Sequence, residues 1–172
     1  MKKIKLFCLL VFIVSSMAFT KKAPTDIITL GQNIFNAIKS ENKEQLLDLI
    51  VTNEEMIETI DDSNLSDSIK ASFKSEFITM LNEKSDKTTA QIIKGYTTIR
   101  NDIDNKKCGN SITLGRLTEN TSHLKNLPIE LGHLEIEYLC KKKSSIIDVE
   151  IINTTRGWRI LEKLRLRAKE KK

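Results

Sequence analysis

The apolar residues of this chain change their spacing once, near Asn110, and this change constrains the fold more than any other feature. Before Asn110 they recur every three or four residues, which is the period of an amphipathic helix. After Asn110 they alternate, which is the period of a strand with one buried face. We therefore predict an α+β fold in which N-terminal amphipathic helices pack on a C-terminal curved antiparallel β-sheet.

Three helix starts are marked in the first half of the chain. Apolar residues at helical spacing predict a first helix from Ile27 to about Ser40. The segment Asn42–Gln45 has the residue pattern of a capping box ahead of a leucine-rich stretch, and Thr52–Glu55 repeats that pattern. Each capping box predicts one further helix.

A fourth helical segment is unusually long. From Leu65 to Ile103 the apolar spacing stays helical over a span that one continuous helix would extend to about 60 Å. The polar stretch Glu83–Thr89 interrupts the apolar residues. We expect two helices, or a kink, at that stretch.

The second half of the chain has the pattern of a sheet. Ile112, Leu114 and Leu117 predict a short strand, and Thr118–Leu127 is expected to be a loop. Three longer alternating segments follow, separated by short polar connections at 142–145 and 154–157, and they predict an antiparallel meander. The residues expected on its apolar face are Leu134, Ile136, Tyr138, Cys140, Ile147, Val149, Ile151, Trp158, Ile160, Leu164 and Leu166.

The first eighteen residues have the features of a secretory signal peptide. Three lysines lie within the first five residues, Leu6–Val14 is an unbroken apolar run, and small residues precede a cut after Ala18. The run is shorter than the ~20 residues of a membrane-spanning helix, although an uncleaved anchor is the alternative. We predict a signal peptide at 1–18, a single α+β domain at 19–172, and export to the periplasm or the extracellular space.

The distribution of charged residues along the sequence limits the kinds of partner that the protein is expected to bind. The chain has 28 Lys and Arg against 23 Asp and Glu, and part of that excess belongs to the leader. Outside the tail Arg165–Lys172 the sequence has no basic cluster interleaved with stacking aromatic residues, so a nucleic-acid partner is not expected. Membrane contact is expected to be at most peripheral, through this basic tail.

Cys108 and Cys140 are the two cysteines that cleavage of the leader would leave. In an exported chain they most simply form one disulfide, which closes a loop of about 33 residues and contributes ~3–4 kcal/mol in the loop-entropy model. Two buried thiols are the alternative. A metal site is not expected, because the spacing of four ligands is missing, and no cofactor is predicted.

The order of elements resembles a known superfamily. Amphipathic helices followed by an antiparallel sheet whose last strand opens with Gly157-Trp158-Arg159-Ile160 resemble the cystatin-like, nuclear-transport-factor-2-like superfamily. Within it the resemblance is to small exported bacterial proteins of uncharacterised function of the Bacteroidota type, with Phe35–Ile50 as the matching helical segment. The resemblance implies that helices and sheet form a cone, which is often a small-molecule pocket, sometimes catalytic and sometimes empty. The fold alone therefore does not give the function.

Glu162 is the residue that fits its expected position least. Strict alternation from Trp158 places this carboxylate on the apolar face of the last strand, where it would be costly unless paired or hydrogen-bonded. One interpretation is a ligand pocket lined by Tyr138, Trp158 and Glu162. The alternatives are a β-bulge that turns Glu162 outward, or a sheet end that leaves its face in water.

The opposite face of the sheet is expected to carry charges of both signs. Acids on the first two strands of the meander and bases on the third predict cross-strand ion pairs, each contributing only ~0.2–1 kcal/mol. A divalent cation held by His133, Glu135, Glu137 and Glu150 is a second interpretation. The charged residues of this face are His133, Glu135, Glu137, Asp148, Glu150, Arg159, Lys163, Arg165 and Arg167.

The sequence shows no recognisable pair of a nucleophile and a base, because neither histidine has a spacing that ties it to a serine or to an acid. The favoured hypothesis is an exported non-enzymatic protein that holds a small apolar ligand in the cone or binds a protein partner, with a homodimer as one arrangement. The second is an accessory or structural envelope protein whose cone is filled by its own side chains. The third is a hydrolase- or isomerase-like enzyme of the same superfamily that uses Glu162 as a base.

Overall fold

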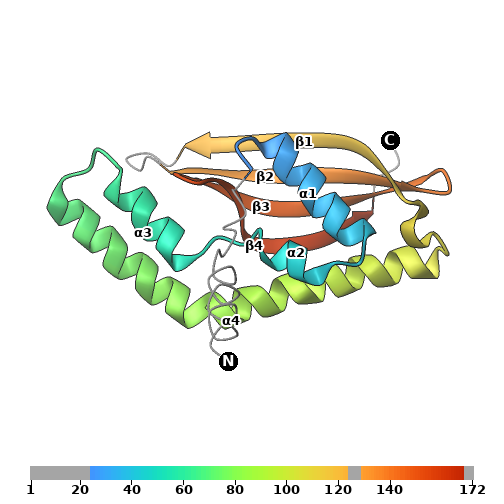
Figure 1. Cartoon of the computed structure of the whole chain (residues 1–172), viewed down its shortest axis with the longest axis horizontal. Coiled ribbons are helices and arrows are strands. Elements are labelled where there is room, and N and C mark those ends of the chain that lie inside the picture. Colours follow the sequence, from blue (N-terminus) through green and yellow to red (C-terminus); the bar gives the residue numbers. More distant parts are fainter. Residues whose placement is uncertain (1–23, 124–128, 169–172) are drawn as a thin grey trace, which may run out of the picture.

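The computed structural model describes residues 24–123 and 129–168 of the 172-residue chain. The predicted signal peptide at 1–18 lies outside the described residues. Within them, the helices come first and a four-stranded antiparallel sheet follows, which confirms the predicted α+β class. Figure 1 shows α1 lying across the strands and the long α4 running beneath them in the view. In the described part of the chain, no helix is long and apolar enough to cross a membrane.

Helix α1 (Ile27–Lys39) begins at a side-chain cap and packs through one face. The carboxylate of Asp26 accepts a hydrogen bond of 2.7 Å from the backbone N–H of Thr29, which satisfies one of the free donors at the helix start. The apolar residues at helical spacing are buried, as the sequence predicts. They are Ile27, Leu30, Ile34, Phe35 and Ile38.

Two short helices follow, and both begin at the predicted caps. In α2 (Lys43–Leu47) the side chain of Asn42 accepts from the backbone N–H of Gln45 at 2.9 Å. In α3 (Asn53–Asp61) the capping box is complete, because Thr52 and Glu55 each accept from the other's backbone N–H at 3.2 Å.

Helix α4 (Asp67–Asn105) is a single helix of 39 residues, so the expectation of two separate helices is wrong. Figure 1 shows that α4 changes direction about midway, as expected of a kink, while the helix continues. The helix can continue past its polar stretch because it rests on the rest of the protein through both halves. Its first half contributes Phe77 to one apolar cluster, and its second half contributes Ile92 and Ile99 to another.

The sheet is formed by β1 (Thr113–His123), β2 (Glu130–Cys140), β3 (Lys143–Thr154) and β4 (Gly157–Ala168) in that order. The meander of β2, β3 and β4 confirms the prediction. The loop expected at 118–127 is wrong up to residue 123, since β1 pairs with β2 as far as His123. The segment has polar side chains on both faces because it is an edge strand held by backbone hydrogen bonds rather than by burial.

The sheet has helices on both faces. Ile151 of β3 belongs to the main core together with Ile92 of α4 and with α1. The next residue, Ile152, belongs to a second cluster with Met56 of α3 and Phe77 of α4. Neighbouring strand residues point to opposite faces. The two halves of α4 therefore cover opposite faces, and the helix crosses the sheet at its β4 edge.

The edge of β4 is covered along most of its length. The backbone N–H of Trp158 donates to the carbonyl of Pro24 at 2.8 Å. Ile160 donates to Leu49 at 2.8 Å and accepts from Val51 at 3.0 Å, in a short parallel bridge. Helix α4 covers the edge beyond that bridge. A covered edge cannot pair with another chain.

Candidate functional site

A groove of about 430 Å³ lies where α4 passes along the edge of β4. It is partly open to solvent, and its two walls come from segments about seventy residues apart in the sequence. The lining residues are Gln91, Lys94, Gly95 and Thr98 of α4 and Lys163, Leu164, Arg165 and Leu166 of β4.

Each wall follows from local structure. Gln91, Lys94, Gly95 and Thr98 are spaced by three, one and three residues, which places them on one face of a helix. On β4, the lining segment begins with the last residue of a bulge, Lys163. Val149 pairs with Leu164 but Ile151 pairs with Ile160, so β4 has two more residues than β3 between these pairs. Such a bulge bends a strand and re-aims its side chains.

Gly95 sets how closely the two walls approach. A Cβ atom built on this glycine would lie 2.0 Å from the carbonyl oxygen of Leu164, a distance that atoms do not reach. Only glycine therefore allows the helix to touch the strand backbone at this point. The contact forms the floor of the groove. Lys94 and Thr98, which have longer side chains, precede and follow Gly95 in the sequence.

The groove is positively charged. Three of its eight lining residues are Lys or Arg, and none of the eight is acidic. Lys163 is paired, since its Nζ lies 3.1 Å from Glu150 Oε1 and 3.6 Å from Glu162 Oε2, and this pairing raises the pKa of its ammonium group. Lys94 and Arg165 are exposed, and within the described part of the chain neither has an ion pair shorter than 4.0 Å, although Asp148 of β3 lies directly opposite Arg165 in the sheet. They are the two cations available to a ligand.

The three residues predicted to line a pocket in the cone are not brought together. Tyr138 pairs with Ser145 beside the β2–β3 turn, whereas Trp158 pairs with Asn153 beside the β3–β4 turn. Ser145 and Asn153 are eight positions apart on β3, or about 27 Å along the strand. Tyr138 and Trp158 are both buried core residues, 0% and 6% exposed.

Glu162 lies inside the β4 bulge, and its side chain is 35% exposed. The bulge breaks the alternation that places this carboxylate on the apolar face, and it was one of the two alternatives drawn from the sequence. Glu162 lies 3.6 Å from Lys163, so its charge has a partner. It does not line the groove between α4 and β4.

The outer face of the sheet carries the expected cross-strand ion pairs in part. Glu150 pairs with Lys163, and Glu135 pairs with Arg167. Arg159 differs, because its guanidinium is buried against Glu55 of α3 and also donates to the carbonyl of Asp48 at 3.1 Å. Among the described residues, no three His, Cys, Asp or Glu side chains come close enough together to hold a metal ion.

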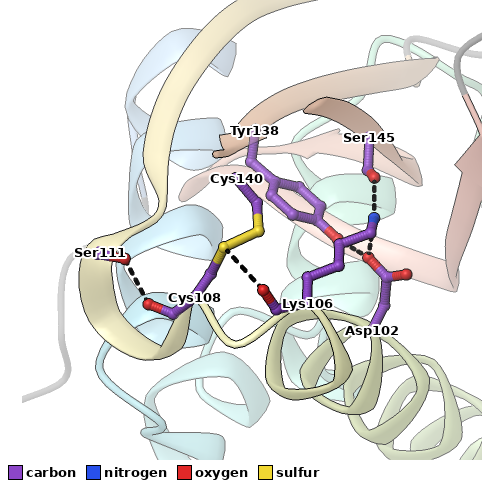
Figure 2. Close-up of a disulfide and its surroundings, with 7 residues drawn as sticks. All are labelled: Asp102, Lys106, Cys108, Ser111, Tyr138, Cys140 and Ser145. Atoms are coloured by element: carbon purple, nitrogen blue, oxygen red, sulfur yellow. Dashed lines mark hydrogen bonds and ion pairs between the residues drawn. A yellow bond between two sulfur atoms is a disulfide. The ribbon is translucent and has the colours of Figure 1, made fainter. Parts of the chain in front are cut away.

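A polar cluster lies beside the disulfide at the end of α4, and Figure 2 shows its members converging. The Tyr138 hydroxyl donates to Asp102 Oδ2 at 2.7 Å. Lys106 Nζ donates to the same oxygen at 2.5 Å and to Ser145 Oγ at 2.9 Å. Burial, and then the bond to Asp102, raises the pKa of Tyr138 far above its usual range.

This cluster is built for structure rather than for nucleophilic chemistry. Lys106 is an ion-paired ammonium group that donates to Ser145, so it has no lone pair with which to take the serine's proton. The neighbouring Cys108 and Cys140 are bonded, which confirms the predicted disulfide, and both are buried. The cluster and the disulfide together fasten the C-terminal end of α4 to β2 and β3.

Sequence reasoning missed the groove between α4 and β4. Its two walls come together only because α4 packs along β4 in the folded protein, and no residue spacing in the sequence predicts that contact. Gly95, inside a strongly helical segment, is the one signal that could have indicated a close backbone contact. Comparison of the chain with protein-family models, with curated proteins and with solved structures finds no match.

Proposed function

We propose that the protein is an exported, non-enzymatic binding protein, and that its ligand is an anionic molecule bound in the groove between α4 and β4. The observation that carries the proposal is that two cations, Lys94 of α4 and Arg165 of β4, line the two walls of this groove. Each is exposed, neither makes an ion pair within the described residues, and no acid lines the groove between them. Cations placed in this way favour an anionic ligand.

The size of the groove fits this role. Small-molecule sites are usually clefts of ~300–1,000 Å³ with a few polar groups around an apolar surface, and about 430 Å³ falls within that range. Leu164 and Leu166 supply apolar surface, and Gln91 and Thr98 supply polar groups.

Export is supported by the disulfide. A bond between Cys108 and Cys140 forms and persists in an oxidising compartment. The basic and then apolar residues of the leader agree with this compartment.

Two other functions are separable by experiment. An accessory protein without a ligand is favoured by the filled inner face of the sheet, where Leu134, Ile136 and Ile147 are fully buried. An enzyme with Glu162 as its base needs that carboxylate free, whereas it has Lys163 beside it. Unchanged turnover of a substrate by Glu162→Gln would exclude this base.

The test is a fluorescence titration with 8-anilinonaphthalene-1-sulfonate, an anionic dye with an apolar ring system. The Lys94→Glu/Arg165→Glu variant is expected to bind the dye at least about tenfold more weakly than the wild type, because two attractive charges become repulsive. The matched control is Lys141→Glu/Lys143→Glu, which makes the same charge change at the exposed β2–β3 turn. Equal weakening in both variants, or in neither, would overturn the proposal.

A further inference from the structure

We infer that the anionic ligand is a single-chain amphiphile, with its acid group between Lys94 and Arg165 and its alkyl chain along Leu164 and Leu166. This inference rests on the proposed function, because it names the chemical class of the ligand for the same groove. It follows from the apolar surface that the groove offers in addition to its charge.

Charge alone cannot hold a small anion here. Lys94 and Arg165 are solvent-exposed, and an exposed ion pair changes an equilibrium by about fivefold at most. Sites for free phosphate or sulfate add several converging N–H donors. The Thr98 hydroxyl already donates to the carbonyl of Lys94 at 2.9 Å, so it offers an acceptor rather than a donor. A ligand held in this groove must therefore gain affinity from apolar contact.

The apolar surface is supplied by β4. Leu166 is half-buried and packs against the edge of the main core, so part of its side chain remains accessible. Leu164, two residues earlier on the same strand, is only 3% exposed, so most of the accessible apolar surface belongs to Leu166. Gly95 adds no side chain between the two walls, so the backbone of β4 and the accessible part of Leu166 line the groove there. A flexible alkyl chain can follow such a surface, and burial of each methylene strengthens binding by up to about fourfold.

An extended peptide fits the same groove less well. Peptides that bind along a strand gain their affinity from backbone hydrogen bonds to a free sheet edge. That edge is occupied at Leu164 by the backbone of α4, and upstream by Pro24, Leu49 and Val51. The main chain of a peptide would therefore find few partners.

The chain's own C-terminus is also a poor occupant. The side chains of the residues after β4, which are Lys169, Glu170, Lys171 and Lys172, carry three positive charges and one negative charge. A segment with an excess of positive charge is repelled by Lys94 and Arg165. The groove is therefore suited to a separate, negatively charged molecule.

The experiment is a displacement titration with straight-chain carboxylates of increasing length, from acetate through hexanoate to dodecanoate, below their micelle concentrations. The reporter is bound 8-anilinonaphthalene-1-sulfonate, and direct calorimetry with dodecanoate checks binding without the dye. Affinity is expected to rise about two- to fourfold per methylene. The Lys94→Glu/Arg165→Glu variant should bind every member of the series more weakly, by a similar factor.

Leu166→Asn tests the chain contact, with Leu166→Met as the control that keeps an apolar side chain of similar size. The Asn variant should lose most of the dependence on chain length, whereas the Met variant should keep it. Thermal unfolding of both variants shows that each is folded.

The outcomes separate the two proposals. Affinity that does not change with chain length, yet falls in the Lys94→Glu/Arg165→Glu variant, would overturn the amphiphile and leave an anion-binding groove. Dodecanol bound as tightly as dodecanoate, with no effect of the charge reversal, would overturn the anionic ligand. Calorimetry that detects no dodecanoate binding, together with a groove variant that binds dye like the wild type, would overturn both.

Discussion

Gly95 of α4 lies directly against Leu164 of β4, so closely that a Cβ atom on the glycine would stand 2.0 Å from the leucine's carbonyl oxygen. This contact joins the longest helix to the last strand, and it forms the floor of the groove between them. The stability of the protein and the shape of its candidate site therefore depend on the same pair of residues.

Gly95→Ala is expected to lower the free energy of unfolding by about 1–3 kcal/mol, the usual range for overpacking a filled site. Alanine is the better helix former by about 1 kcal/mol, so intrinsic propensity alone predicts the opposite sign. The obstacle is backbone rather than the end of a flexible side chain, so the helix itself must move. Urea denaturation of both proteins measures the difference.

Gln91→Ala is the control for Gly95→Ala, because Gln91 is an exposed residue one turn earlier on the same face of α4. Its effect should stay within about 0.5 kcal/mol, as is usual at exposed positions. A Gly95→Ala protein as stable as the wild type would contradict the contact between the helix and the strand.

Local signals made part of the fold predictable from the sequence. Thr52 and Glu55 form a capping box in the structure because both partners lie within one helical turn, and no distant residue is needed to specify the motif. The meander was predictable for the same reason, since its strands alternate and its connections are short. Cys108 and Cys140 were predictable as a pair because only two cysteines follow the predicted signal peptide.

The remaining features depend on tertiary contacts. Arg159 alternates with the apolar residues of β4 and so looks like a surface charge, but α3 folds over it and supplies Glu55 as a buried partner. Glu162 is turned by a bulge whose two additional residues have no signature in the alternation. The polar residues of β1 resemble a loop because pairing with β2 requires only their backbone.

Two arginines near the β3–β4 turn pair with two glutamates one turn apart on α3, and the pairs should differ in strength. Glu55 and Arg159 are buried, 1% and 9% exposed at the side chain. Glu58 and Arg156 are each more than 40% exposed. Glu55→Gln is expected to cost about 3–5 kcal/mol, because it leaves a buried guanidinium without its counter-charge. Glu58→Gln should cost no more than about 1 kcal/mol.

Chemical denaturation of the two variants, with Glu55→Gln/Arg159→Met as a third, measures this difference. In the third protein both charges are removed, so it should recover part of the stability lost in Glu55→Gln. Equal losses in the Glu55 and Glu58 variants would show that burial of the first pair does not matter.

The disulfide should stabilise the protein through the loop that it closes. Replacing Cys108 and Cys140 together by serine is expected to lower the free energy of unfolding by about 3–4 kcal/mol, the loop-entropy value for a separation of 32 residues. Reductant should destabilise the wild type toward the same value and leave the double-serine variant unchanged. Wild-type stability in the double-serine variant would mean that the polar cluster of Asp102, Lys106 and Tyr138 holds the end of α4 by itself.

Tyr138 should make the protein sensitive to alkaline pH. Burial first, and then the hydrogen bond to Asp102, raises the pKa of its hydroxyl in the folded protein, which means that the folded state favours the neutral phenol. The neutral phenol's contribution to stability is fully present below the pKa of about 10 that tyrosine has in the unfolded chain. It is lost as the pH rises from there through the higher pKa of Tyr138 in the folded protein. The wild type should therefore lose stability steeply above about pH 10.

Tyr138→Phe separates this effect from other alkaline titrations. It removes the bond to Asp102, so at about pH 8 the variant should be less stable by about 1 kcal/mol. Between that pH and about pH 11 it should lose less stability than the wild type, because its unfolded state gains no phenolate at this position. Tyr96→Phe is the control, since burial raises the pKa of Tyr96 but its side chain is only half-buried. Identical losses in the wild type and in Tyr138→Phe would contradict the coupling, because they would mean that the Tyr138 phenol ionises as readily in the folded protein as in the unfolded chain.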